Sequence, residues 1–265
     1  MPKTPLAVVH DARMFLPSIF SCRFKAHRLV YLASLTLICC FTALVAHAAP
    51  FEDTIAQRTM ACTACHGKQG RAAPDGYYPR LAGKPAGYLY NQLVNFRDGR
   101  RHYGLMTQLV DPLTDSYLME IAEYFSLLEV PYPAPVPTLA PAALLRQGER
   151  LAMQGDAARK IPACVQCHGQ AMTGVAPNIP GLLGLPRDYL NAQLGAWKAG
   201  QRRAHAPDCM KDVVARLSLE DINAVGSWLA AQALPADTRP ALALPALATG
   251  ASAIKCGSAP TKAGP

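Results

Sequence analysis

The sequence has no basic patch interleaved with aromatic residues, although its 26 basic and 18 acidic residues leave a formal charge of +8. Such a patch is the usual footprint of a nucleic-acid-binding protein. The first 48 residues hold five of the basic residues and one of the acidic ones, so the rest of the chain carries 21 against 17 and a formal charge of +4. The overall charge therefore gives no reason to expect a nucleic-acid partner.

Strand patterns are also missing, because no segment shows a convincing alternation of apolar and polar residues. Hydrophobic residues make up 51% of the chain, which excludes a mostly disordered protein. Thr114 and the pair Ser218 and Asp221 are suitable N-caps. Apolar residues recur at helical spacing in four segments, which predict an all-α fold: 51–65, 86–99, 114–128 and 222–232.

Charge is absent from the 17-residue apolar run between Leu29 and Val45. A basic segment precedes this run, and Ala46-His47-Ala48 follows it as an Ala-x-Ala cleavage site. The pattern predicts a signal peptide over residues 1–48 and export to the periplasm. An uncleaved membrane anchor is the alternative, because the run is slightly long for a signal core and slightly short for a membrane span.

Three of the nine cysteines lie in the predicted signal, so six remain in the exported chain. Four of these form two C-x-x-C-H motifs, in "ACTACHGKQG" (61–70) and "ACVQCHGQAM" (163–172). Two cysteines at this spacing can bond to the two vinyl groups of one haem, and the histidine that follows is then held near the iron. We therefore predict two covalently bound haem c groups, attached at Cys62, Cys65, Cys164 and Cys167, with His66 and His168 as iron ligands.

Two other kinds of site also use C-x-x-C pairs. A thioredoxin-like redox pair follows a strand and does not require the histidine. A zinc site can combine two such pairs but gives no reason for a histidine after each. Haem attachment is a chemistry of exported proteins, so the predicted signal favours it over both alternatives.

The two motifs belong to two copies of one longer unit. His66 aligns with His168 at an offset of 102 residues. Residues 79–101 match 180–203 at an offset of 101. Further along, 106–125 match 210–229 at an offset of 104, and each of these segments opens with a methionine.

Those two methionines, Met106 and Met210, lie 40 and 42 residues after their histidines. A thioether is a soft, neutral ligand that suits haem iron, so we predict them as the second axial ligands. The alternative ligands are His102 and His205. The remaining methionines downstream of the signal are expected to fill the core: Met60, Met119, Met153 and Met172.

These copies resemble tandem class I cytochrome c domains, most closely the dihaem cytochromes of the cytochrome c4 family. The similarity covers residues 51–234 and rests on C-x-x-C-H, a Pro- and Gly-rich loop, a Tyr-Leu-x-x-Gln-Leu helix, Gly-x-Arg, the methionine and a closing helix. It implies two small all-α domains, each built around one haem. It also implies that a proline carbonyl supports each ligand histidine, with Pro74 and Pro177 as the matching residues. Tyr124 and Trp228 take the aromatic position of the closing helix, in a packing role.

The expected organisation has five parts. A signal over 1–48 precedes a first cytochrome c domain over 49–130, a linker over 131–141, a second domain over 142–234 and an Ala/Pro-rich tail over 235–265. The linker lies in "VPYPAPVPTLAPAA", which contains five prolines and is expected to be extended and semi-rigid. The tail shows no helical period and is expected to lie on the surface or to be disordered.

The resemblance implies a periplasmic electron carrier and not an enzyme, because two irons with His and Met ligands leave no open site for substrate. Its partners would be an electron donor and an acceptor, such as a membrane respiratory complex, a dehydrogenase or a terminal oxidase. One alternative is a dedicated cytochrome subunit of a periplasmic dehydrogenase. Another is a dihaem peroxidase, against which the two methionines argue.

Two cysteines remain after haem attachment, Cys209 directly before Met210 and Cys256 in the tail. In an exported protein they most simply form a disulfide, which would pin the tail beside the second haem and stiffen the Met210 segment. Two free thiols, or intermolecular bonding through Cys256, are the alternatives. Four arginines repeated in both copies are expected to contact haem propionates, an acidic partner or solvent: Arg100, Arg101, Arg202 and Arg203.

Overall fold

The computed structural model describes residues 27, 29–37, 52–73, 76–135, 137–242 and 256–259 of the 265-residue chain. The chain divides into two units, Met1–Glu52 and Asp53–Pro265, which are described separately. In the first unit residues 29–37 are helical and exposed. Over the described residues, none of the helices combines the length and apolar character needed to cross a membrane. The predicted cleavage site and most of the predicted signal lie outside the described residues.

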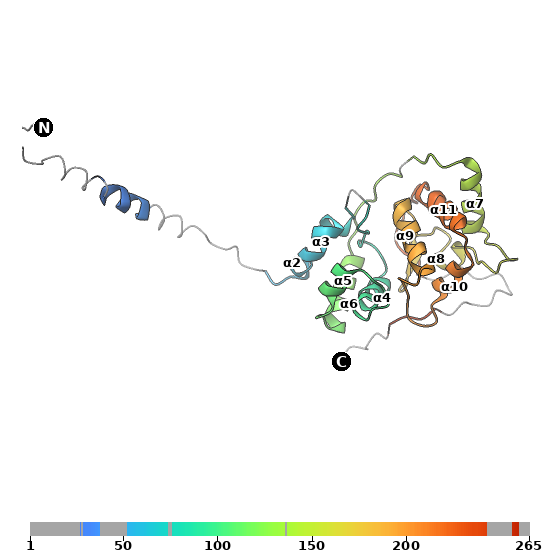
Figure 1. Ribbon diagram of the computed structural model, residues 1–265, viewed down its shortest axis with the longest axis horizontal. Coiled ribbons are helices and arrows are strands. Elements are labelled where there is room, and N and C mark those ends of the chain that lie inside the picture. Colours follow the sequence, from blue (N-terminus) through green and yellow to red (C-terminus); the bar gives the residue numbers. More distant parts are fainter. Residues whose placement is uncertain are drawn as a thin grey trace, which may run out of the picture. The chain divides into compact units, whose positions relative to one another are not determined.

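The second unit contains the helices of both sequence copies, coloured from cyan to orange-red along the chain in Figure 1. We call residues 53–130 the first half and 142–234 the second half. Helices of the first half are α2 (Ile55–Arg58), α3 (Met60–His66), α4 (Ala86–Arg97), α5 (Gly104–Val110) and α6 (Asp115–Ser126), with a 3₁₀ turn, η1, at Lys68–Gly70. Those of the second half are α7 (Ala142–Met153), α8 (Val165–His168), α9 (Arg187–Lys198), α10 (Cys209–Arg216) and α11 (Leu219–Ala230).

The predicted all-α fold is confirmed, with one short exception. Two-residue strands β1 (Gly174–Val175) and β2 (Ile179–Pro180) pair antiparallel in the loop after α8. Their alternation is too short to leave a pattern in the sequence. Ala241, in the predicted tail, forms a parallel bridge with Val175 and so extends this small sheet. Thus this part of the tail is hydrogen-bonded to the second half, and it lies on the surface, as one of the two expectations for the tail had it.

Local capping explains where the helices begin. The Thr114 hydroxyl accepts the Tyr117 N–H at the start of α6, and Ser218 and Asp221 form a reciprocal capping box at the start of α11, as the sequence predicted. The predicted helix over 51–65 is broken at Thr59, whose hydroxyl donates to the Ile55 carbonyl 2.8 Å away. The Thr59 backbone, at φ −89° and ψ 6°, ends α2, and α3, which carries the first C-x-x-C-H motif, begins at the next residue.

Each half has its own hydrophobic core. The first gathers around Leu118 and Phe125 of α6, packed on α4. The second gathers around Leu151 of α7 and Leu229 of α11. Helices α7 and α11 approach so closely that a Cβ on Gly148 would lie 2.1 Å from the Ala224 carbonyl oxygen.

The two halves are joined by backbone hydrogen bonds. The Tyr88 N–H at the start of α4 donates to the Pro177 carbonyl over 3.0 Å, and Arg101 forms an antiparallel bridge with Arg202. Gly87 permits the approach of α4, because a Cβ there would lie 2.2 Å from Asn178 Oδ1. The halves therefore meet at the segments that follow the second haem motif and that close α4 and α9.

The predicted linker begins in contact with both halves. The Arg80 guanidinium stacks on the Tyr132 ring at 3.7 Å and donates to the Val130 and Pro131 carbonyls. On the other side, a Cβ on Gly184 would lie 2.4 Å from Tyr132 Cδ1. No helix or strand is found over the described residues between α6 and α7, which agrees with the extended segment that its prolines predict.

Candidate haem sites

The first C-x-x-C-H motif and Met106 line the same cavity, of about 580 Å³. Cys62, Cys65 and His66 come from α3, and Met106 comes from the first turn of α5. Apolar side chains of α4 and α6, among them Leu89 and Phe125, complete the lining. The structure thus brings together the four first-half residues that the repeat picked out, although 40 residues separate the histidine from the methionine.

The second motif and Met210 line a second cavity, of about 220 Å³. Cys164 directly precedes α8, Cys167 and His168 lie in it, and Met210 is the second residue of α10. The two C-x-x-C pairs therefore line separate cavities. Among the residues described, no three His, Cys, Asp or Glu side chains gather to hold a metal ion.

Each motif histidine is held by a backbone carbonyl. His66 Nδ1 lies 2.7 Å from the Pro79 oxygen, and His168 Nδ1 lies 2.7 Å from the Pro180 oxygen. A carbonyl can only accept, so each Nδ1 carries the hydrogen, and Nε2 keeps its lone pair. Burial lowers the pKa of both histidines, which favours the neutral ring that an iron ligand needs.

The prolines implied by the resemblance were the wrong ones. His168 pairs with Pro180 and not with Pro177, whose carbonyl instead accepts the Tyr88 N–H. His66 pairs with Pro79, while Pro74 lies outside the described residues. The repeat could have identified the correct prolines, because Pro79 and Pro180 are the first residues of two matching segments in the copies.

None of the four motif cysteines forms a disulfide. Burial raises the pKa of Cys62 and Cys167, and it raises that of Cys164 to about 11. These three side chains therefore lack the low pKa that marks the reactive cysteine of a thioredoxin-like redox pair.

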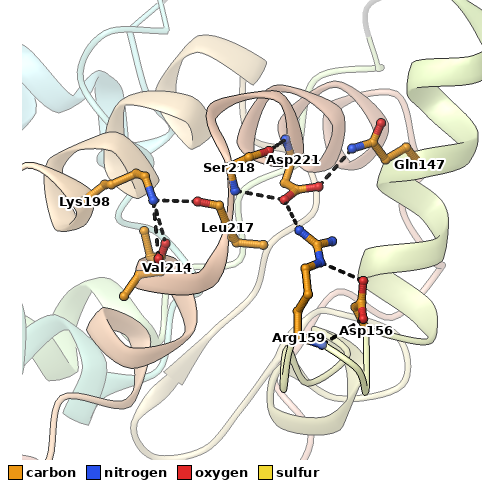
Figure 2. A network of polar contacts seen from close by, with 9 residues as sticks. Gln147, Asp156, Arg159, Lys198, Val214, Leu217, Ser218 and Asp221 are labelled. Carbon is orange, nitrogen blue, oxygen red and sulfur yellow. Dashed lines mark hydrogen bonds and ion pairs between the residues drawn. The ribbon is translucent and has the colours of Figure 1, made fainter.

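A polar network holds the end of α10 in the second half (Figure 2). The Lys198 ammonium donates to the Leu217 carbonyl over 2.6 Å and also reaches the Val214 carbonyl. Beyond it, Arg159 bridges Asp156 and Asp221 at 2.7 and 2.6 Å. Burial by itself would raise the pKa of Asp221, but hydrogen bonds from Arg159 and Ser218 outweigh it and hold the pKa far below its usual value.

The first half repeats only part of this network. Arg97, the counterpart of Lys198, donates to the Leu113 carbonyl over 3.2 Å and pairs with Asp115 at 2.7 Å. In the second half these contacts tie the end of α10 to α9. In the first half they tie the segment after α5 and the start of α6 to α4.

A disulfide joins Cys209, the first residue of α10, to Cys256 of the tail, with the Cα atoms 5.3 Å apart. The tail then follows the boundary between the halves. Gly257 N–H donates to the Pro207 carbonyl, and the Ala259 N–H donates to Asn91 Oδ1 of α4 over 2.6 Å. Ala259 is buried against the first-half core, so the expectation that the tail lies on the surface or is disordered is wrong at this residue.

Two arginines that the repeat pairs lie inside the boundary between the halves. The Arg101 guanidinium donates to Gln193 over 2.6 Å and to Gln92 over 3.2 Å. Arg202, which is 5% exposed, donates to the same two glutamines over 2.7 and 2.9 Å. Simple solvation is therefore excluded for Arg202. Neither arginine forms an ion pair with a carboxylate of the described residues.

The other two repeated arginines, Arg100 and Arg203, make different contacts. Arg100 donates to Asn95 over 2.7 Å, pairs with Asp98, and has His205 Nε2 2.9 Å away. Arg203 is exposed and reaches the Gly99 carbonyl. His205 thus already has a polar partner. His102, the other alternative ligand, is exposed at the rim of the first cavity.

The second cavity contains a buried donor that lacks a partner. Trp197 Nε1 is buried without a hydrogen bond, and its ring lies 3.8 Å under the Arg202 guanidinium. The cations Lys84 and Arg202, 6% and 5% exposed, also line this cavity. A haem c fits this lining, because it has an apolar ring system, two propionate carboxylates and two positions for cysteine sulfur. The residues present therefore suit the cofactor that the motifs predict.

Comparison with known proteins agrees with this geometry. No family model matches the chain. The thiosulfate dehydrogenase electron acceptor of Thiomonas intermedia is 44% identical over 174 residues, which are 65% of this chain and 79% of that protein. The structure of reduced cytochrome c4 from Pseudomonas stutzeri superimposes with a TM-score of 0.57 and 32% identity, over 69% of this chain and 99% of that one.

A third relative is larger than this chain. Thiosulfate dehydrogenase TsdBA from Marichromatium purpuratum superimposes with a TM-score of 0.58 and 33% identity, over 65% of this chain but only 36% of that protein. The cytochrome c4 structure is matched over almost its whole length, and its likeness includes both halves of the fold. The chain therefore belongs to the cytochrome c4 family, and it is a dihaem c-type cytochrome that transfers electrons.

Proposed function

We propose that each half binds one haem through the residues that line its cavity. Cys62 and Cys65 hold the first haem, with His66 and Met106 as its axial ligands. Cys164, Cys167, His168 and Met210 hold the second haem in the same way. The observation that carries this proposal is the repetition of all four residues around two separate cavities, with the same carbonyl on each histidine.

The haem iron supplies a one-electron redox couple. The chain positions it: a carbonyl orients each imidazole through Nδ1–H, which also makes Nε2 a stronger donor. A methionine thioether is neutral, so it favours a higher potential than a second histidine. A histidine and a methionine on each iron would leave no position for a substrate. The protein would then act as an electron carrier and not as an enzyme.

The domain organisation follows from the two cavities. We place the first cytochrome c domain at 49–130, the linker at 131–141, the second domain at 142–234 and the tail at 235–265. The two separate cores and the extended segment between α6 and α7 support these limits. Residues 1–48 would act as the export signal, so the mature protein would work in the periplasm, free or tethered by an uncleaved anchor.

The partner that we favour as electron donor is a thiosulfate dehydrogenase. Support comes from the Thiomonas protein, named as an electron acceptor of that enzyme, and from the likeness to part of TsdBA. The onward acceptor would be a terminal oxidase or a membrane complex. The likeness to cytochrome c4 supports a second candidate, a general respiratory carrier without a dedicated dehydrogenase.

A reduction assay separates these candidates. Oxidised protein is mixed with thiosulfate and a catalytic amount of a thiosulfate dehydrogenase, and haem reduction is followed optically. A dedicated acceptor should be reduced far faster than a monohaem cytochrome c at equal concentration. Equal rates for the two acceptors would contradict the dedicated role and would leave the general carrier as the function.

A further inference from the structure

Residues 256–259, which we call the strap, begin on the second half. Cys256 is disulfide-bonded to Cys209, the first residue of α10. The Gly257 N–H donates to the Pro207 carbonyl over 2.8 Å. A Cβ on Gly257 would lie only 2.3 Å from the carbonyl oxygen of the residue before Pro207. A covalent bond, a hydrogen bond and a close backbone contact therefore hold this end of the strap against the segment that leads into α10.

The far end of the strap enters the first half. Ala259 is 6% exposed within the first-half core, and its N–H donates to Asn91 Oδ1 of α4 over 2.6 Å. Asn91 Nδ2 in turn donates to Asn178 Oδ1, between β1 and β2 of the second half, over 3.4 Å. Asn91 thus connects α4, the loop after α8 and the strap. The repeat aligns it with Ala192, whose side chain can neither donate nor accept.

The strap covers one cavity and not the other. Cys256 and Gly257 line the second cavity together with Met210, whereas none of the four strap residues lines the first cavity. In the first half Leu105 takes the place of Cys209, lines its cavity and is 61% exposed. The methionine side of the second cavity is therefore closed by a segment that the first cavity lacks.

The disulfide decides whether the strap stays in place. Cys256 is exposed and Cys209 is half-buried, so a thiolate from outside can reach the sulfur of Cys256. Once the disulfide is reduced, the strap keeps the hydrogen bonds of Gly257 and Ala259 and one buried methyl group. Fixing the backbone of four residues costs more free energy than these contacts contribute. The reduced strap should therefore leave its position.

We propose that the strap is a thiol-sensitive closure: it covers the second cavity and joins the halves while the Cys209–Cys256 disulfide is intact, and a dithiol that reduces the disulfide releases it. One thiolate of the dithiol attacks Cys256 Sγ, and Cys209 leaves as a thiolate. The second thiol of the dithiol then resolves the mixed disulfide. Two electrons and two protons pass to the two cysteines, and the dithiol becomes a disulfide. This regulation goes beyond the proposed electron transfer.

The test uses the full-length protein loaded with both haems. Ascorbate keeps the irons reduced in two samples, and dithiothreitol is added to one of them to reduce the disulfide. In that sample amide hydrogen exchange should become about tenfold faster at Gly257 and Ala259, the factor that one hydrogen bond is worth. The Ala241 amide, which donates to the Gly174 carbonyl over 2.9 Å outside the strap, should keep its rate.

Carbon monoxide measures access to the second cavity in the same two samples. Binding to one of the two reduced haems should become faster by a similar factor when the strap is released, and binding to the other haem should not change. Hydrogen exchange at the strap does not depend on which residues ligate the irons. A failure of the proposed haem ligands would therefore leave the exchange result standing and would affect the carbon monoxide result alone.

Asn91→Ala releases the far end of the strap while the disulfide stays intact. Exchange should then rise at Ala259 and stay slow at Gly257. Asn95→Ala is the matched control, because Asn95 is another buried asparagine of α4 whose side chain accepts from Arg100 and not from the strap.

Cys256→Ser leaves α4 untouched and keeps the test decisive if Asn91→Ala does not fold. It should release the strap without a dithiol, and dithiothreitol should then cause no further change. Unchanged exchange at Gly257 and Ala259 after both thiols have been reduced would overturn the inference. Carbon monoxide binding that stays the same at both haems after the strap has been released would overturn the closure of the second cavity.

Discussion

In the first half, Met106 follows Leu105, whose side chain is 61% exposed; in the second half, Met210 follows Cys209, which is disulfide-bonded to the tail. The halves agree in the carbonyl on each histidine and in a cation at the end of the helix before the methionine. On the proposed haem sites, these shared contacts would position the haem. The differences around it would decide how firmly the methionine is held.

The largest expected effect comes from removing one haem at a time. Replacing Cys164 and Cys167 by alanine should leave one haem per chain, because the first cavity has its own complete set of residues. The reciprocal change at Cys62 and Cys65 should leave the other haem. Intact-mass spectrometry with a haem stain measures the count. Loss of both haems in either variant would show that the halves do not load independently.

The disulfide is the clearest difference between the halves, so removing it should make them more alike. Cys209→Ser with Cys256→Ser opens a loop of 47 residues in sequence separation, and such a loop contributes roughly 3 to 4 kcal/mol in the chain-entropy picture. The loss should fall on the second half, where Met210 should detach from iron at lower denaturant than in the wild type.

Met106 supplies the control for that experiment, because α5 carries no disulfide. The denaturant concentration at which Met106 is half detached from its iron should be unchanged in the double serine variant. Separately, alkylation of the unreduced protein should label neither Cys209 nor Cys256. Full labelling of both thiols would contradict the disulfide.

Gly87→Ala tests the contact that joins the halves. The added Cβ would lie 2.2 Å from Asn178 Oδ1 and 2.8 Å from the Pro177 carbonyl oxygen, so α4 must move away from the second half. We expect a loss of about 1 to 3 kcal/mol in the free energy of unfolding, as for other overpacked sites. Gly99→Ala is the control, since nothing lies within 4 Å of a Cβ there, although its positive φ of 69° adds a backbone cost of its own.

Because of that backbone cost, the losses in the free energy of unfolding of the two variants do not compare directly. The place in the structure where each substitution acts is more informative. In Gly87→Ala, amide hydrogen exchange should speed up at Tyr88, whose N–H crosses the boundary. In Gly99→Ala the same amide should keep its protection. Equal protection of the Tyr88 amide in both variants would argue against a tight boundary.

The smallest effect is expected at acid pH. The pKa of Asp221 is held below its usual value, so its stabilising contacts are fully present above about pH 4 and are lost as the pH falls further. Arg159→Gln removes the strongest of these contacts and should move acid unfolding of the second half to higher pH. A pH series of melting temperatures measures the shift, and Arg239→Gln, which removes an exposed pair with Asp237, is the control.

Much of the site was predictable because its chemistry is local or repeated. C-x-x-C-H lies within five residues, and the methionines emerged from the repeat. The Cys209–Cys256 pair followed from counting the cysteines left in an exported chain, and the structure contains that disulfide. Helix starts at Thr114 and Ser218 were also local, since a cap depends on the three residues after it.

What the sequence did not reveal depends on contacts between distant segments. Lys84 looks like any lysine before a proline, yet the residue is only 6% exposed in the fold and lines both cavities. Ala259 has no apolar pattern around it, yet the disulfide brings it to Asn91 and the first-half core. The choice of Pro177 failed because several prolines follow the motif, and local sequence does not show which carbonyl faces the ring.

The central claim is that both irons have a histidine and a methionine ligand, one pair from each half. The weak methionine-to-iron absorption band of the oxidised protein tests it most directly, because each half should contribute half of its intensity. Met106→Ala and Met210→Ala should each remove one half of the band, and the double variant should remove all of it. A full band in either single variant that still carries two haems would contradict the account for that half.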